Sequence, residues 1–410
     1  MKLLKVDTLI EAREKIFKKA CSWTLKSETI SLNSENLGRI LAEDIFASDD
    51  IPGFRRAIVD GYAVHSGDTS GATESIPVFL KLAGKVPMGK PVQFSVRSGE
   101  CAYVPTGAML PPGADAVVMT EYAELSDDKV ALYETAAPGA GMAEAGEDAR
   151  KGDLLLGSGA IIRPREAALL SAAGVTEFSV FSPLALSVIS TGDELVPPEK
   201  NPGPGEIRDS NSNALEALAV KRGYRLVSSR LLGDDAGLLE AAIRETSALS
   251  DVVLVSGGSS QGEKDFTADI INRVTKGGVF THGLALKPGK PAILGWDEEN
   301  RTLLAGLPGH PVAAMMVFEL LLGWLFDRLF KVSPPFPIPA RITSNIPGKP
   351  GRTVLQPVTL RFENGTYLAE PVFGKSGMIT TLTRASGYIL IDLNKEGLRK
   401  DEPVLVHLFQ

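Results

Sequence analysis

The residues best suited to chemistry follow an apolar run in the second half of the chain. In the segment Asp251–Asp265 (DVVLVSGGSSQGEKD), Val252–Val255 predicts a short buried β-strand, and the small residues Ser256 to Ser259 follow it. Small side chains let a bulky anion approach the backbone N–H groups of such a loop. A strand, a glycine loop and a helix that begins after Asp265 are typical of phosphate sites in α/β folds. A simple tight turn explains the same residues when they are taken alone.

A second loop has the same arrangement. After the apolar run Leu186–Ser190, Thr191 and Gly192 precede the carboxylates of Asp193 and Glu194. In a parallel sheet, both loops would fall at the carboxyl ends of strands, where ligands bind. A solvated turn is an equally good interpretation of this carboxylate pair by itself.

Two further loops are rich in proline and glycine. Lys287 and Lys290 flank a rigid Pro-Gly turn, and lysine can meet a phosphate or an oxyanion as a point charge. Pro308 and Pro311 fix the backbone around His310 between a strand and a long helix, and Pro311 suits the first helical turn. Solvated lysines and a helix-capping turn are the simpler interpretations.

Turns in the first half of the chain add carboxylates. Asp60 precedes a glycine and a tyrosine within Val59–Val64, where an ordinary Asp-Gly turn is the simpler interpretation. Mg²⁺ commonly uses one or two carboxylates together with the phosphates of a ligand. The residues together indicate a phosphorylated ligand, a divalent cation and group transfer. The carboxylates in or beside turns are Asp60, Asp148, Asp193, Glu194, Asp234 and Asp265.

The elements that must position these loops alternate in the second half of the chain. Strands separated by helices imply βαβ units and a mostly parallel sheet. The predicted strands are Ala185–Ser190, Arg225–Leu231, Val252–Val255, Pro291–Leu294 and Thr302–Ala305; the predicted helices are Ala214–Arg222, Leu238–Ser247, one around Asp269 and a long one from Pro311.

The rest of the chain has other patterns. A capping box at Thr8–Glu11 opens an amphipathic N-terminal helix. Short apolar runs broken by glycine and proline from Ile51 to Val130 indicate a β-rich domain. Ser333–Pro339 is a stiff linker, and alternating apolar residues from Ala340 to Gln410 predict a small all-β domain.

Composition narrows the class of protein. The 410 residues carry a net charge of −7 without a basic block, which argues against a nucleic-acid partner. Two cysteines and four scattered histidines indicate neither a disulfide framework nor a zinc site. The longest apolar region, Val312–Phe326, is too short for a membrane span and contains Glu319. The first residues lack the apolar core of a signal peptide, so we expect a cytoplasmic protein without a membrane partner.

These motifs occur together, in the same order, in a known family. The chain resembles the MoeA-type molybdopterin molybdenumtransferases, which are related to the C-terminal part of gephyrin. The resemblance covers essentially the whole chain, and it is specific because the motifs match jointly. The matching segments are Asp60-Gly-Tyr-Ala63, Pro105-Thr-Gly-Ala108, Gly146-Glu-Asp148, Ser190-Thr-Gly-Asp-Glu-Leu195, Ser256-Gly-Gly258, Gly262-Glu-Lys-Asp265, Lys287-Pro-Gly-Lys-Pro291 and Gly306-Leu-Pro-Gly-His-Pro311.

The resemblance implies a multidomain fold of α/β and β parts. A helical and extended linking domain is expected at 1–48 and 138–176, with an N-terminal helix able to pack on the α/β domain. An inserted β-rich domain is expected at 49–137, and a molybdopterin-binding α/β domain with a mostly parallel sheet at 177–331. A small C-terminal β-barrel is expected at 332–410.

The implied reaction belongs to molybdenum cofactor biosynthesis. Adenylylated molybdopterin and molybdate react with Mg²⁺ present, and molybdenum cofactor and AMP are formed. The resemblance also implies a homodimer, with each cleft built from the α/β domain of one subunit and the N-terminal domains of the other. A molybdopterin adenylyltransferase is the enzyme from which the substrate would be handed over.

The resemblance assigns the site residues. Glu194 and Asp265 are expected to hold the cation, and Lys287 and Lys290 to attract molybdate and phosphate. The expected catalytic residues are Asp60, Thr106, Asp148, Glu194, Asp234, Asp265, Lys287 and Lys290. The expected molybdopterin-binding residues are Thr191, Gly192, Ser256, Gly257, Gly258, Ser259, Pro308, Gly309 and Pro311.

The chain departs from the family pattern at three places. Phe54–Val59 replaces a run that many relatives share, His310 stands where many have asparagine, and Gly283 stands where a lysine is often found. These departures leave open a tungstate-preferring paralogue. A non-catalytic molybdopterin-binding or scaffold protein of the gephyrin type is the alternative from another class. A molybdopterin adenylyltransferase is a further alternative, but it would lack the N-terminal domains and the barrel.

Overall fold

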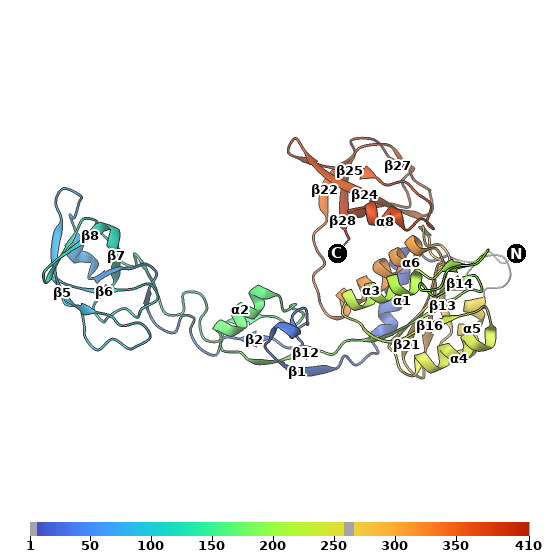
Figure 1. Cartoon of the computed structure of the whole chain (residues 1–410), viewed down its shortest axis with the longest axis horizontal. Helices are drawn as coiled ribbons and strands as arrows, with labels where there is room; N and C mark the ends of the chain where they lie inside the picture. Colours follow the sequence, from blue (N-terminus) through green and yellow to red (C-terminus); the bar gives the residue numbers. More distant parts are fainter. Residues whose placement is uncertain (1–5, 258–265, 410) are drawn as a thin grey trace. The chain divides into compact units, whose positions relative to one another are not determined.

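A computed structural model describes residues 6–257 and 266–409 of the chain (Figure 1). The chain divides into two compact units, which are described separately. The sheet-and-barrel unit comprises Met1–Glu28, Gly38–Ile40 and Val180–Gln410, and the insert unit comprises Thr29–Leu37 and Leu41–Ser179.

The insert unit is built on a six-stranded sheet in the order β7-β4-β6-β5-β9-β8. Neighbouring strands are antiparallel except β5 and β6. Side chains alternate between two buried faces, so that Ala63 packs in one cluster and Tyr62 and Val64 in another. The strands are β4 (Gly61–Val64), β5 (Val78–Lys85), β6 (Glu100–Val104), β7 (Ala116–Met119), β8 (Ala123–Ser126) and β9 (Lys129–Leu132).

The chain around this sheet forms shorter elements. Two antiparallel strand pairs and one helix, α2 (Pro164–Ala172), belong to the insert unit, and the pair β1 (Ser27–Ser31) and β12 (Glu177–Phe181) runs across the division between the units. The two pairs are β2 (Ile45–Phe46) with β11 (Leu154–Leu156), and β3 (Arg56–Ala57) with β10 (Met142–Ala143).

The sheet-and-barrel unit contains a second six-stranded sheet, in the order β16-β13-β17-β21-β20-β18. The first four strands are parallel, whereas β20 runs antiparallel to both of its neighbours. All residues of β13, β17, β20 and β21 are buried, as expected for a sheet covered on both faces. The strands are β13 (Ala185–Thr191), β16 (Arg225–Leu232), β17 (Val252–Ser256), β18 (Val279–His282), β20 (Ile293–Asp297) and β21 (Thr302–Leu307).

Helices cover this sheet. Helix α4 (Ala236–Ser247) packs on α5 (Phe266–Val274), and α3 (Asn211–Lys221) packs on α6 (Pro311–Val317) (Figure 1). The predicted long helix from Pro311 is interrupted, because a π-helical turn at Phe318–Gly323 separates α6 from α7 (Trp324–Leu329). Apolar periodicity over this region could not reveal a change in backbone hydrogen bonding.

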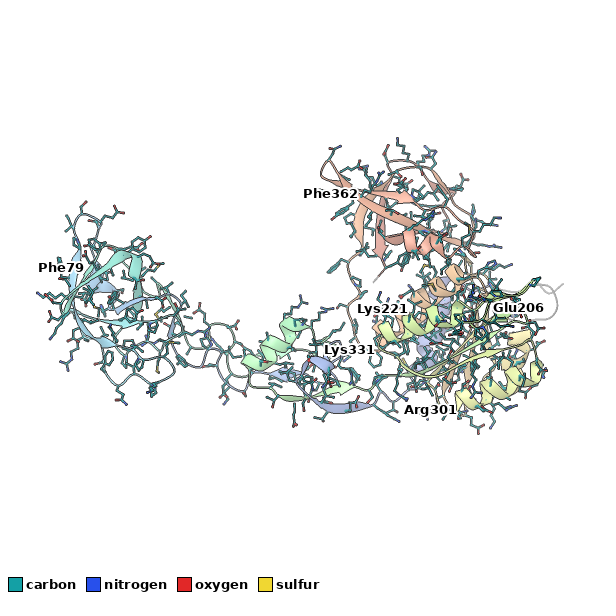
Figure 2. All side chains as sticks on the ribbon, viewed as in Figure 1. Phe79, Glu206, Lys221, Arg301, Lys331 and Phe362 are labelled. Atoms are coloured by element: carbon teal, nitrogen blue, oxygen red, sulfur yellow. The ribbon has the colours of Figure 1, made fainter. Side chains whose placement is uncertain are left out.

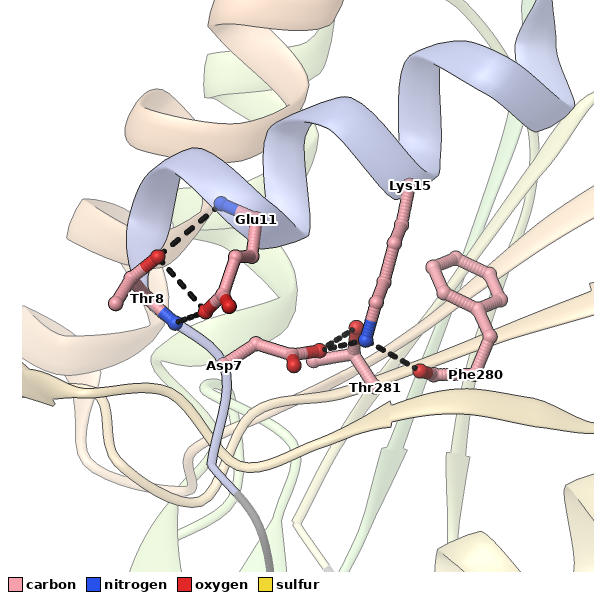
Figure 3. A network of polar contacts seen from close by, with 6 residues as sticks. All are labelled: Asp7, Thr8, Glu11, Lys15, Phe280 and Thr281. Atoms are coloured by element: carbon pink, nitrogen blue, oxygen red, sulfur yellow. Dashed lines mark hydrogen bonds and ion pairs between the residues drawn. The ribbon is translucent and has the colours of Figure 1, made fainter.

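The N-terminal helix α1 (Leu9–Ala20) is fixed to the same unit (Figure 3). Thr8 and Glu11 form the predicted capping box. Buried Asp7 accepts hydrogen bonds from Thr281 Oγ1 at 2.6 Å and Lys15 Nζ at 2.6 Å, and Lys15 also donates to the carbonyl of Phe280. The charge of Asp7 is thereby compensated inside the protein.

Five strands close a barrel in the last part of the chain, in the order β24-β25-β22-β28-β26 and back to β24. Short strand β19 (Leu286–Lys287) leaves the α/β region and pairs with β24. The interior is apolar and includes Ile342, Val358 and Val406. The barrel strands are β22 (Ile338–Ile342), β24 (Thr353–Glu363), β25 (Thr366–Pro371), β26 (Gly387–Ile391) and β28 (Pro403–Leu408), with helix α8 (Thr380–Arg384) and the pair β23 (Ile346–Pro347) and β27 (Gly397–Leu398) beside them.

The fold therefore has the class expected from the sequence, a multidomain combination of a mostly parallel α/β sheet, an inserted β-rich part and a C-terminal barrel. Among the described residues, no helix is long and apolar enough to cross a membrane.

Candidate functional site

The loops that follow the parallel strands open at one edge of the sheet. In the strand register, Thr191 lies beside Leu232, and Ser256 lies between Ser190 and Leu307. Each of these positions is at or next to the last residue of its strand. The carboxyl ends of β13, β16, β17 and β21 therefore lie side by side, and open α/β sheets bind ligands at such an edge.

The Lys287–Pro291 turn lies at the same edge. Because β20 is antiparallel to β21, its first residue, Ile293, pairs with Gly306 near the end of β21. Gly289 has φ +121°, and a Cβ there would lie 2.7 Å from Val317 Cγ2, so only glycine lets this turn pack on α6. Lys287 is exposed and Lys290 is half-buried.

Three carboxylates gather around the loops after β13 and β16. Asp234 Oδ1 accepts a hydrogen bond from Thr191 Oγ1 at 2.9 Å, and the Asp234 N–H donates to Asp193 Oδ1 at 2.9 Å. The carboxylate of Glu194 lies against Gly192, where an added Cβ would be 2.7 Å from its Oε2. Its backbone carbonyl accepts from Ile207 at 2.7 Å, next to the strand pair β14 (Leu195–Val196) and β15 (Ile207–Arg208). The structure thus brings the predicted Thr191, Gly192, Glu194 and Asp234 together.

The glycine loop begins where expected. Gly257 has φ +103°, and a Cβ there would lie 2.1 Å from the carbonyl oxygen of Thr191. Only glycine can therefore follow Ser256 at this close approach of two strand ends. The predicted residues Gly258, Ser259 and Asp265 lie outside the described residues.

One residue that the sequence analysis did not single out joins two of these loops. Asn211 Nδ2 donates to Ser256 Oγ at 2.7 Å and to the carbonyl of Gly309 at 2.9 Å. Since a carbonyl oxygen can only accept, the contact with Gly309 fixes which way the amide faces. Asp209 supports this arrangement by accepting from the Asn211 and Ser212 backbone N–H groups. A polar Asp-Ser-Asn-Ser run at the start of α3 was the signal in the sequence.

The turn from Pro308 to Pro311 is held from two sides. Pro311 occupies the predicted first position of α6, and the Gly309 carbonyl is bound by Asn211. On the other side, His310 Nδ1 lies 2.8 Å from Ser376 Oγ of the barrel, and the Val312 N–H donates to the Ser376 carbonyl at 3.2 Å. Sequence reasoning missed Ser376 because 66 positions separate it from His310.

The insert unit holds the remaining predicted residues. Asp60 Oδ1 accepts from the Thr106 N–H at 2.7 Å and from Thr106 Oγ1 at 3.1 Å, so these two side chains meet. Asp148 instead lines a polar hollow of about 470 Å³ with Glu144 and Arg150. Within the described part of the chain, Asp148 forms no hydrogen bond with Asp60 or Thr106.

The donor chemistry at the strand edge fits a hard divalent cation. Glu194 is exposed, and its carboxylate oxygens accept no hydrogen bond from another described residue. Over residues 6–257 and 266–409, no group of three or more histidine, cysteine or acidic side chains is placed to hold a metal. Mg²⁺ does not require such a group when phosphates of a ligand supply the other oxygens. Glu194 is the described residue suited to hold it.

Three family models match successive parts of the chain. Residues 8–174 match the MoeA N-terminal region (domain I and II), residues 187–327 match the model described as "Probable molybdopterin binding domain", and residues 339–409 match the MoeA C-terminal region (domain IV). An α/β sheet with ligand loops at one edge, joined to a barrel, is thus the architecture of a molybdopterin-handling protein.

Similar proteins agree over the full length. The molybdopterin molybdenumtransferase of Haemophilus influenzae is 32% identical, with 98% of each chain covered, and that of Bacillus subtilis is 29% identical over 96% of this chain and 93% of its own. The crystal structure of a molybdopterin biosynthesis MoeA protein from Pyrococcus horikoshii has a TM-score of 0.79 and 36% identity, and covers 99% of this chain and 100% of its own. The chain belongs to the MoeA family of molybdopterin molybdenumtransferases.

Proposed function

We propose that this enzyme of molybdenum cofactor biosynthesis inserts molybdate into adenylylated molybdopterin with release of AMP, and that it depends on Mg²⁺. Family membership supports the transferase reaction. The observation that carries the proposal is the meeting of carboxylates, lysines and glycine loops at one sheet edge. Cytoplasmic location is part of the same proposal.

The chemistry needs positioning and charge neutralisation more than a protein nucleophile. Molybdate and the pyrophosphate linkage of the substrate are both anionic, and AMP leaves with additional negative charge. Lys287, the last residue of β19, and Lys290, in the turn before β20, attract these anions. Ser256 and Gly257 accept the phosphate of the pterin beside their backbone N–H groups, and Thr191, Gly192, Pro308 and Gly309 form the adjoining wall. Gly258 and Ser259 continue the first of these loops.

The carboxylates have separate roles. Glu194, together with Asp265, holds Mg²⁺, which would neutralise charge on the phosphates when bound. Asp234 keeps Thr191 oriented through the 2.9 Å hydrogen bond described above. Because Thr191 ends β13, this bond fixes the backbone from which Gly192 and Glu194 extend.

The insert unit supplies the other residues. We propose that Asp60 and Thr106, held together by two hydrogen bonds, and Asp148 complete the cleft from the second subunit of a homodimer. A molybdopterin adenylyltransferase hands over the substrate. The four domain boundaries given above remain predictions of the same kind.

A scaffold function is the rival from another class. The described carboxylates and both lysines are retained, which favours catalysis over a protein that only binds molybdopterin. A tungstate-preferring paralogue is the rival within the class, because His310 and Gly283 depart from the common pattern.

The decisive experiment measures the release of AMP. The purified protein is incubated with adenylylated molybdopterin and Mg²⁺, with molybdate or tungstate added, and AMP is measured by chromatography. We expect AMP release that requires both the oxyanion and the cation. A binding protein would retain the pterin without releasing AMP, and faster release with tungstate would reassign the oxyanion.

A further inference from the structure

A large cavity in the sheet-and-barrel unit lies apart from the strand edge. Its volume is about 890 Å³, within the usual range for small-molecule sites. The π-helical turn and α7 line it, together with the linker around Phe336 and barrel residues such as Tyr388 and His407. Among residues 6–257 and 266–409, none of those that line it belongs to the loops after β13, β16, β17 or β21. The proposed transfer reaction therefore does not use this cavity.

The cavity wall contains a backbone irregularity. The helix that begins at Pro311 changes to a π-helical turn at Phe318–Gly323, and Arg13 Nε of α1 donates to the carbonyl of Leu320 at 2.8 Å. Arg13 also stacks over the ring of Trp324, with its guanidinium carbon 5.3 Å from the ring centroid. Single π-helical turns in proteins are frequent at functional sites.

The positive charges in the cavity are not balanced. Arg222 is paired with Glu319 and with Asp327 at 3.4 Å. Half-buried Arg13 has no carboxylate within 4.0 Å in residues 6–257 and 266–409, and its two terminal nitrogens make no hydrogen bond to the residues described there. Arg328 and two lysines, Lys221 and Lys331, which Figure 2 labels, also line the cavity. Among the described residues that line the cavity, cations thus outnumber carboxylates, and an anion would complete the charge balance.

The pKa shifts of these two half-buried arginines show the same contrast between a paired and an unpaired charge. Burial lowers the pKa of the Arg13 guanidinium. Burial acts in that direction on Arg222 as well, but its hydrogen bond and charge contact with Glu319 raise the pKa above the ordinary value. The contrast follows from the missing counter-ion of Arg13, since a desolvated charge without a partner is costly.

Aromatic rings provide a second kind of contact. Tyr388 and His407 are stacked, with ring centroids 5.2 Å apart and planes at 18°, and Phe336, which also lines the cavity, is 96% exposed. Flat rings in such a cavity favour a flat partner. An arginine with two free terminal nitrogens favours a phosphate or carboxylate, which it can bind through both nitrogens.

We propose that this cavity is a second ligand site that binds a small aromatic anion, with Arg13 bound to its phosphate or carboxylate group and its ring among Trp324, Tyr388 and Phe336. The site is independent of the transfer reaction and of the metal. Its ligand would act on the junction between the π-helical turn and the barrel rather than on the strand edge.

The three tryptophans of the chain allow a site-specific test. Trp324 lines the cavity, whereas Trp23 and Trp296 do not, and their rings pack on each other at 5.8 Å. The full-length protein is labelled with 5-fluorotryptophan, and the Trp324 fluorine signal is assigned with Trp324→Phe. Phenyl phosphate is the probe, and phenol and inorganic phosphate are its two halves. We expect a saturable shift of the Trp324 signal alone, with phenyl phosphate bound more tightly than either half.

Variants separate this site from the strand edge. Arg13→Gln removes a charge-assisted contact, so the dissociation constant for phenyl phosphate should rise about tenfold or more. Lys287→Ala should leave it unchanged. Unaltered Trp23 and Trp296 signals would show that Arg13→Gln is folded. If this variant does not fold, binding of phenyl phosphate, phenol and inorganic phosphate to the unmodified protein decides whether the site exists. Absence of a saturable shift, equal binding of phenol, or full binding by Arg13→Gln would overturn the proposal.

Discussion

The strand edge of the sheet-and-barrel unit and the Asp60–Thr106 pair of the insert unit bring polar residues together in different ways. At the strand edge, parallel pairing places Thr191 beside Leu232 and Ser256 between Ser190 and Leu307, so the strand ends lie together regardless of their sequence separation. In the insert unit, Asp60 and Thr106 meet through two specific hydrogen bonds at the ends of antiparallel strands.

The difference shows which contacts follow from topology. A general rule about the carboxyl ends of parallel strands was enough to predict the first set. No such rule exists for an antiparallel sheet, and only the family resemblance connected Asp60 with Thr106. Substitutions in both regions can test whether the residues of the strand edge and the Asp60–Thr106 pair serve the same reaction.

Glu194→Gln should have the largest effect. It removes the free carboxylate suited to hold Mg²⁺, so we expect AMP release to fall about 100-fold or more, as for other removed electrostatic contacts. Steady-state kinetics against Mg²⁺ concentration measure this. Glu206→Gln is the matched control, because Glu206 (Figure 2) lies in the same segment but pairs with Lys200. We expect this variant to retain activity. Near-normal rates of AMP release by Glu194→Gln would show that the strand edge does not take part in the reaction.

Asp60→Asn should have a smaller effect, of about tenfold on AMP release. Asparagine keeps an oxygen that can accept from the Thr106 N–H, so the turn survives while the charge is lost. Thr106→Ala removes only the 3.1 Å side-chain bond and should cost less. If Asp60 only holds the turn, Asp60→Asn will match the unmodified protein in AMP release, and the comparison between the two regions fails.

Asn211→Ala tests how the strand edge is held together. It removes two hydrogen bonds at a buried position, so we expect a loss of about 1–3 kcal/mol in the free energy of unfolding and a raised KM. All three tryptophans lie in the sheet-and-barrel unit, so urea titration by fluorescence reports on that unit. Exposed Asn213 is the control, and Asn213→Ala should change stability little. Equal behaviour of the two variants would show that the two loops are held without Asn211.

Much of the strand edge could be predicted from the sequence. Apolar runs followed by glycine, threonine or carboxylates identified the ends of β13 and β17, and Pro311 marked the start of α6. The contacts of Asn211 and of Ser376 could not be predicted, because they depend on which loops meet in space rather than on any local pattern.

The π-helical turn could not be predicted from the sequence either. Residues 318–323 have the apolar composition of an ordinary buried helix, and the change in hydrogen bonding is compensated by distant groups such as Arg13. The predicted roles of the site residues stay predictions, and Gly258, Ser259 and Asp265 also lie outside the described ranges.

Ser66→Ala should have the smallest effect, in the insert unit. Burial acts to raise the pKa of Asp115, but hydrogen bonds from the Ser66 N–H and hydroxyl outweigh it and hold the pKa below the ordinary value. A lowered folded pKa contributes stability above the unfolded value that is lost as pH falls through the folded one. NMR titration of the Asp115 carboxyl carbon should show a higher pKa in Ser66→Ala. An unchanged Asp115 pKa in Ser66→Ala would show that groups other than the Ser66 hydroxyl lower it.

The central claim is that the strand edge of one subunit and the Asp60 turn of another serve one reaction. Its most direct test mixes the Glu194→Gln and Asp60→Asn variants and lets their subunits exchange, with native mass spectrometry to confirm mixed dimers. Random exchange makes half of the dimers mixed, and each mixed dimer holds one intact site, so AMP release should recover to about a quarter of the unmodified level. Mixed dimers that form without any recovery above the separate variants would contradict the claim.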